Sequence, residues 1–190
     1  MKNFKLIKNN YFLLSLILLL AILLRLPNLN QAFWGDEILS LQIVKHFRGD
    51  INGLFLYLKT VEVHPPLYYL FLSFWTHFFG FSELAVRFLS VIFGLATIIL
   101  SYFLGKQIWD NERTGLLAAL LVAIMPMPIM FSQEARPYII FSFFGLLCLY
   151  QLNNYLIKDR WQSLVYFSFF AILGLYLHYS FFLILLPLFF

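Results

Sequence analysis

The chain alternates between long apolar runs and short polar turns. After the amino-terminal stretch MKNFKLIKNN comes the run YFLLSLILLLAILL, and later apolar runs lie at roughly 66–79, 84–105, 115–131, 137–157, 161–177 and 179–190. Within these runs the apolar residues are continuous, without the period-two alternation of a membrane β-strand. The pattern therefore predicts helices that cross a membrane, each needing about 20 residues.

The run PLYYLFLSFWTHFFG is short for a crossing and carries His77. If it stays outside, the basic residues of the later turns fall on the same side as the amino-terminal lysines, as the positive-inside rule prefers. These residues are Lys106, Arg113, Lys158 and Arg160. We therefore expect an all-α polytopic protein with about six transmembrane helices, a cytoplasmic amino terminus, and one external loop at 27–83 with juxtamembrane helices.

The composition supports an integral membrane protein and excludes some classes of function. Hydrophobic residues make up 62% of the 190 residues and charged residues 12%, with a mean hydropathy of +0.84, whereas soluble domains carry about 25% charged residues. The basic residues are scattered, so no nucleic-acid surface is expected. The single cysteine, Cys148, excludes an intrachain disulfide.

The last run stops at Phe190 without a polar flank, so we expect residues 1–190 to be one truncated transmembrane domain.

Two adjacent carboxylates, Asp36 and Glu37, follow the first apolar run in FWGDEILSLQIVKHF. Asp36 can cap an amphipathic helix, and its expected apolar face consists of Ile38, Leu41, Val44 and Phe47. Under one interpretation Asp36 only caps and Glu37 only complements the helix dipole. Under the other, a carboxylate fixed at a helix start beside the bilayer is a general base.

The segment KTVEVHPPLYYLF places Glu62 and His64 two residues apart on an extended stretch, so both side chains face the same way. The prolines that follow predict a helix from Leu67 and by themselves require no function. The pair could hold a phosphate, a sugar hydroxyl or, as the weakest of the three, a divalent cation.

Further charged side chains lie on the same expected face. Arg87, in the first turns of the second span, either snorkels to the interface or binds a lipid phosphate. Glu134 and Arg136 in FSQEARPY either pair with each other or face the loop that carries Asp36. His178 is best explained as an ordinary residue of the membrane interface.

The ordered set FWGDE, VEVHPPLYY, ELAVRFLSVIFGLAT and FSQEARPY resembles the amino-terminal half of a GT-C type polyprenyl-phosphate-sugar-dependent glycosyltransferase. That family includes protein O-mannosyltransferases and the aminoarabinose transferase of lipid A. The resemblance implies sugar transfer from a polyprenyl-phosphate carrier to a protein, lipid or glycan hydroxyl, with inversion. It also implies action at the external face, which we place in a bacterial cytoplasmic membrane.

The resemblance assigns roles to individual residues. It makes Asp36 the base and Glu37 the adjacent acid. It puts His64 near the carrier or acceptor, Arg87 at the donor phosphate, and Glu134 at the acidic site of the second external loop. The alternatives are a transporter or flippase, and a membrane subunit that binds lipid carriers without catalysis. The sequence does not identify the sugar, the acceptor or the type of carrier.

Overall fold

The computed structural model of the chain describes residues 2–61 and 64–188, with side chains from residue 10 onward, and no strand occurs in these ranges. The helices are α1 (Lys2–Arg25), α2 (Gly35–His46), α3 (Ile51–Thr60), α4 (Leu67–Phe79), α5 (Glu83–Trp109), α6 (Glu112–Ile124), α7 (Pro126–Ser132), α8 (Tyr138–Lys158), α9 (Trp161–Leu177) and α10 (Phe182–Leu185), with the 3-10 turns η1 (Tyr179–Phe181) and η2 (Leu186–Leu188).

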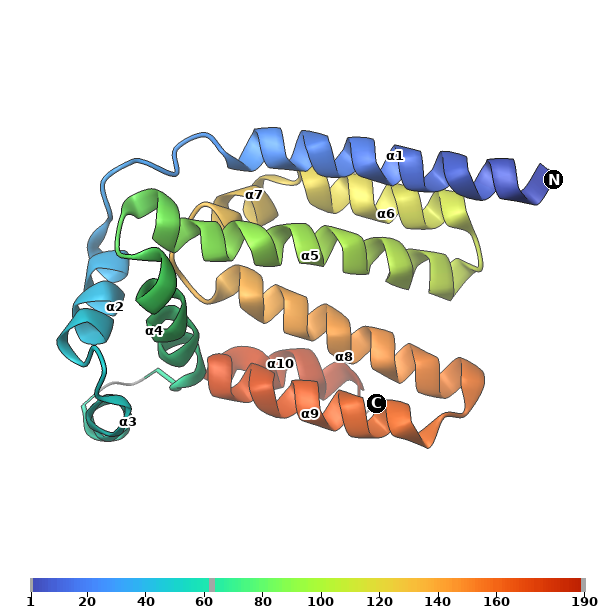
Figure 1. The fold of residues 1–190 in the computed structure, drawn as a ribbon. Coiled ribbons are helices and arrows are strands. Elements are labelled where there is room, and N and C mark those ends of the chain that lie inside the picture. The colour runs from blue at the N-terminus through green and yellow to red at the C-terminus, as the bar shows by residue number, and fades with distance from the viewer. Residues whose placement is uncertain (1, 62–63, 189–190) are drawn as a thin grey trace.

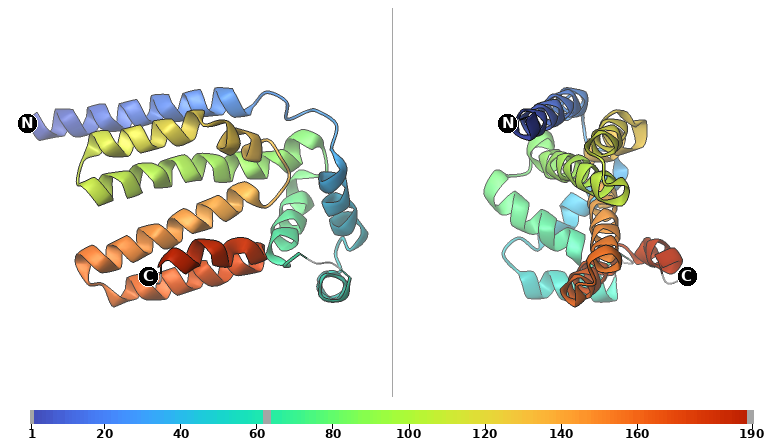
Figure 2. Two further views of the ribbon diagram at one scale, coloured as in Figure 1. Left: turned by 180° about the vertical axis from the view of Figure 1, so that it is seen from behind. Right: turned by 90° about the vertical axis from the view of Figure 1, so that its right-hand side faces the viewer.

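The long helices run side by side, whereas α2, α3 and α4 lie together at one end of the bundle (Figure 1). Helix α5 is central, because it packs against α1, α4, α6, α7 and α8. The side and rear views show the same arrangement, with the amino terminus at the end far from α2–α4 (Figure 2). The chain thus has two different ends, one covered by the loop helices and one made of tight turns.

Among the described residues, α5 with 27 residues and α8 with 21 are long and apolar enough to cross a membrane, and α6 with α7 forms a third span if the bent pair is counted as one. Shorter apolar helical segments cover Asn10–Arg25, Trp161–Leu177 and Tyr179–Leu188. The predicted class, an all-helical polytopic membrane protein, is confirmed.

The short apolar run behaves as predicted. It forms the 13-residue helix α4, which begins at Leu67 and lies across the end of the bundle instead of running along it (Figure 1). As a result, the α5–α6 and α8–α9 turns, which carry the four basic residues, lie at the same end as the amino terminus. Which side of the membrane this end faces stays a prediction from the positive-inside rule.

The third span is not the continuous helix that its apolar run suggested. It breaks between α6 and α7, whose axes differ by 62°. The break lies at Met125, which is extended at φ −62° and ψ 134°. Pro126 disfavours helical geometry in the residue before it and has no N–H to donate. The last carbonyls of α6 therefore need other partners.

Arg25, the last residue of α1, supplies those partners. Its Nη1 donates to the carbonyl of Ala123 at 2.9 Å, and its Nη2 donates to the carbonyl of Val122 at 3.2 Å. Its Nε donates to Ser132 Oγ at 3.2 Å, and the side chain is 0% exposed. Gly94 makes room for this arrangement, because a Cβ there would come within 2.2 Å of Ser132 Oγ.

The carbonyls at the end of α1 in turn accept hydrogen bonds from the segment after α7. Gln133 Nε2 donates to the carbonyl of Pro27 at 2.8 Å and to that of Leu24 at 3.2 Å. Each helix end thus takes hydrogen-bond donors from the other segment, which pairs carbonyls that have no partner within their own helix.

We predict that Arg25→Leu lowers the stability of the chain by about 2 kcal/mol or more, because it leaves buried carbonyls without donors. Thermal unfolding in detergent can be followed by a thiol-reactive fluorophore, since the only cysteine, Cys148, is buried. Arg113→Leu, which removes an exposed arginine at the other end, is the control. Equal unfolding temperatures for the two variants would contradict the capping role.

Candidate functional site

The residues that the sequence singled out gather at the end covered by α2–α4. Asp36 and Glu37 start α2, Arg87 lies in the second turn of α5, and Glu134 and Arg136 lie in the α7–α8 connection. His64 precedes α4, and His178 follows α9. Glu62 lies outside the described residues.

Glu37 is fully buried and forms a two-pronged ion pair with Arg87. Arg87 Nε donates to Oε1 at 2.9 Å and Nη2 donates to Oε2 at 2.6 Å. The backbone N–H of Ala135 donates to Oε1 at 2.7 Å, and that of Trp34 donates to Oε2 at 3.2 Å. Both carboxylate oxygens are therefore engaged by two donors each, with an exposed fraction of 0% for Glu37.

The remaining donors of Arg87 hold the loop that follows α1. Nη1 donates to the carbonyls of Leu29 at 3.0 Å and Gln31 at 2.6 Å, with a longer bond to Asn28. Nη2 donates to the carbonyl of Ala32 at 3.3 Å. The guanidinium also lies over a ring, 5.2 Å from the centroid of Phe33. Every N–H group of Arg87 is thus used inside the protein.

Asp36 is not the helix cap that we expected. Trp34 occupies the N-cap position, Gly35 starts the helix, and Asp36 is its second residue. The buried stripe of α2 begins at Glu37 and includes Ser40, Leu41 and Val44, whereas Ile38 is 43% exposed. The predicted apolar face is wrong at Ile38, because the charged Glu37 takes the inward position to reach Arg87.

The Asp36 side chain is 51% exposed, and its nearest cation is Arg136, with 3.6 Å between Oδ2 and Nη2. Its backbone is held firmly, because its carbonyl accepts from Arg136 Nη1 at 3.2 Å and from Ser40 Oγ at 3.0 Å. Arg136 Nη1 also donates to Ser40 Oγ at 3.0 Å. The result is a fixed residue with an accessible carboxylate.

Arg136 is 6% exposed and carries one unused donor, since its Nε is buried without a hydrogen-bond partner among the described residues. Its guanidinium lies 5.8 Å from the centroid of the Tyr138 ring. Its positive charge pairs with Asp36, contributes to the lowered pKa of His178 and partly offsets the raised pKa of Glu134. Arg136 therefore connects the carboxylate of α2 to the region around His178.

Glu134 lies against the same charges. Its carbonyl accepts from Ser90 Oγ at 2.6 Å, which fixes the loop on α5. Burial raises the pKa of the Glu134 carboxyl, and repulsion from Glu37 raises it further. A carboxyl that holds its proton more tightly than usual is a candidate for proton transfer.

The histidines come together beside a pocket of about 220 Å³. The rings of His64 and His178 are 6.1 Å apart, and the pocket is lined by His64, Lys59, Tyr176 and Tyr179 together with apolar groups. Burial lowers the pKa of His178, and the charges of His64 and Arg136 lower it further. In the described ranges no three His, Cys, Asp or Glu side chains are placed to hold a metal ion.

The sequence did not single out Lys59, Ser40 or the two tyrosines. Ser40 lies four residues after Asp36, so helical spacing could have indicated that the two share a face. Lys59 stands in the quoted KTVEVHPP segment, near the end of α3 and five residues before His64. Tyr176 and Tyr179 flank His178, and only the fold brings them to His64.

The family model for dolichyl-phosphate-mannose-protein mannosyltransferases matches residues 63–190. This range contains Arg87, Arg136, His64 and His178, and it begins after Asp36 and Glu37. An uncharacterized protein of Aquifex aeolicus (strain VF5) is 28% identical over 141 residues, which cover 72% of this chain and 27% of that protein. The chain thus spans about a quarter of the length of this relative. No solved structure matches the chain.

Since the family match covers about two thirds of its residues, the chain belongs to the dolichyl-phosphate-mannose-protein mannosyltransferase family.

Proposed function

We propose that this chain forms the external face of a glycosyltransferase that moves a sugar from a polyprenyl-phosphate carrier to an acceptor hydroxyl. One observation carries the proposal: Asp36 keeps a half-exposed carboxylate on a rigid backbone beside Arg136, at the end of the bundle that also holds a pocket lined by Lys59 and His64. A base and a cationic surface on the same face are what transfer from a phosphate leaving group needs.

In the proposed reaction, the acceptor oxygen attacks the anomeric carbon of the sugar while its proton passes to the Asp36 carboxylate. A new carbon–oxygen bond forms as the bond between the anomeric carbon and the phosphate oxygen breaks. The carrier leaves as polyprenyl phosphate with the bonding electron pair. Attack from the side opposite the phosphate inverts the configuration at the anomeric carbon.

The departing phosphate needs hydrogen-bond donors on this face of the protein. Lys59 and His64 line the pocket, and Arg136 Nε has no hydrogen-bond partner among the described residues. We assign the phosphate to this group. Arg87 was predicted from sequence for that role, but all its N–H groups donate to Glu37 and to loop carbonyls. We therefore give Arg87 and Glu37 a positioning role beneath Asp36.

Other parts of the proposal follow from the family and from the charge distribution. The acceptor is a protein, glycan or lipid hydroxyl at the periplasmic or luminal face. The amino terminus lies in the cytoplasm, because the basic turns share its end of the bundle. A divalent cation is a further part of the proposal, and chelation with EDTA during the transfer assay tests for it.

We predict that Asp36→Asn lowers sugar transfer about 100-fold or more, the contribution of a general base. Transfer from a radiolabelled polyprenyl-phosphate sugar is measured in membranes containing the protein. Asp50→Asn is the matched control, because Asp50 lies in the same loop and Asn retains its cap on Gly53. Transfer retained in Asp36→Asn would remove Asp36 as the base.

Glu37→Gln and Arg87→Met each break the buried ion pair and leave its partner uncompensated. We predict a loss of stability of about 3–5 kcal/mol for each, measured by exposure of Cys148 to a thiol dye. The double variant should lose less than the sum of the two, because the groups are in contact. Additive losses would contradict the pairing, and a folded Glu37→Gln protein without transfer activity would favour a direct catalytic role instead.

The raised pKa of Glu134 gives a test by pH. A carboxyl whose pKa is higher in the folded state favours folding while protonated, and this contribution is lost as the pH rises through the folded pKa. We predict that Glu134→Gln, which stays neutral, gains unfolding temperature relative to the unaltered protein between about pH 5 and pH 8. Glu83→Gln, at the start of α5, is the control. A difference that does not change with pH would contradict the effect.

A further inference from the structure

The end of the bundle opposite the candidate site carries a polar pocket of about 540 Å³ between α8 and α9. Lys158, the last residue of α8, and Arg160, just before α9, both line it. Tyr150 and Tyr166 line it further along the two helices, and Gln162 adds an amide. Neither the family match nor the proposed reaction gives this pocket a role.

The pocket lies at the level where lipid headgroups are expected. Trp109 at the end of α5 and Trp161 at the start of α9 are both exposed at this end of the bundle. Exposed tryptophans of membrane proteins gather at the headgroup level. A ligand in the pocket can therefore have its polar part among the basic residues and its apolar part in the bilayer.

The charges favour an anion. Lys158 Nζ is held by the side-chain oxygen of Asn154 at 3.2 Å, and no carboxylate of the described residues forms an ion pair with Lys158 or Arg160. Asp159 stands between them in the chain in a left-handed conformation, at φ 48°, and does not line the pocket. The lining thus offers two cations and several neutral donors.

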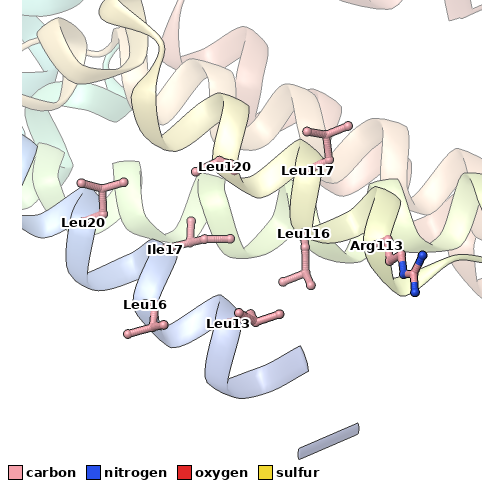
Figure 3. Close-up of a pocket in the computed structure, with 8 residues that line it drawn as sticks. All are labelled: Leu13, Leu16, Ile17, Leu20, Arg113, Leu116, Leu117 and Leu120. Atoms are coloured by element: carbon pink, nitrogen blue, oxygen red, sulfur yellow. The ribbon is translucent and has the colours of Figure 1, made fainter. Parts of the chain in front are cut away.

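Lys158 and Tyr150 also line an adjoining pocket between α5 and α8, together with Lys106 and Asp110. A comparison with the apolar groove on the other side of the bundle supports the assignment. The groove between α1 and α6 is lined by leucines and an isoleucine, with Arg113 at one end (Figure 3). That groove reaches the same basic end of the bundle, but Arg113 is the one polar residue in its lining. It suits a hydrocarbon chain, whereas the α8–α9 pocket suits a phosphate.

We propose that the α8–α9 pocket binds the phosphate headgroup of an anionic phospholipid from the leaflet on this side of the membrane. Lys158 and Arg160 contact the phosphate, and the tyrosines contact the polar backbone of the lipid. A single basic residue near an anionic headgroup changes its affinity by a factor of about five. The bound lipid fixes the α8–α9 turn at the membrane surface.

The test uses native mass spectrometry of the full 190-residue chain in detergent, titrated with phosphatidylglycerol or phosphatidylcholine. The expected result is one retained phosphatidylglycerol per chain in preference to phosphatidylcholine. Arg160→Gln should weaken phosphatidylglycerol binding about fivefold, and Lys158→Gln with Arg160→Gln about 25-fold. Excess inorganic phosphate should not displace the lipid, because it lacks the apolar part.

Arg113→Gln is the matched control, since it removes an exposed arginine from the same end of the bundle but outside the pocket. Its binding of phosphatidylglycerol should equal that of the unaltered chain. An equal loss in Arg113→Gln and Arg160→Gln would show general attraction to the basic end and overturn the proposal. Equal retention of the two lipids, or displacement by inorganic phosphate, would overturn it as well.

Discussion

The buried ion pair between Glu37 and Arg87 determines how the end of the bundle covered by α2–α4 is built. It joins the start of α2, the loop at 28–32, helix α5 and, through Ala135, the connection before α8. Two charges removed from water are costly unless their hydrogen bonds are complete. Here both carboxylate oxygens and all the guanidinium N–H groups are paired. The pair is therefore stable only when all four segments are in place, so it specifies their arrangement.

The segment from residue 132 to 136 completes the same arrangement, because its consecutive residues bond to different parts of the protein. Ser132 accepts from Arg25, and Gln133 donates to the end of α1. The carbonyl of Glu134 accepts from Ser90 of α5, the N–H of Ala135 donates to Glu37, and Arg136 holds Asp36. This segment can reach so many partners because α7 turns away from α6 at Pro126. The proline break thus positions the site.

The sequence predicted the parts of the structure that depend on local patterns. Continuous apolar runs identified the helices, the paired prolines placed the start of α4 at Leu67, and the short run was correctly kept out of the bundle. Other features depend on partners far along the chain. Arg87 and Glu37 are 50 residues apart, and Arg25 reaches carbonyls about 100 residues away. Local patterns predicted which charges share one end of the bundle, but not which are paired and which are accessible. For the same reason Asp36 was wrongly expected to be a cap.

The adjacent carboxylates of the GDE segment have different environments because they are consecutive on a helix. Neighbouring helical residues point about 100° apart. Because Glu37 points inward, the Asp36 side chain lies at the edge of the buried face of α2. The ion pair below fixes the helix, and the bonds from Arg136 and Ser40 fix the Asp36 backbone without using its carboxylate oxygens for these contacts. Residues that hold a reactive group in this way act on reaction rate through geometry. In the proposed reaction the Asp-Glu pair thus separates two tasks: Glu37 anchors the helix, and the Asp36 carboxylate stays accessible.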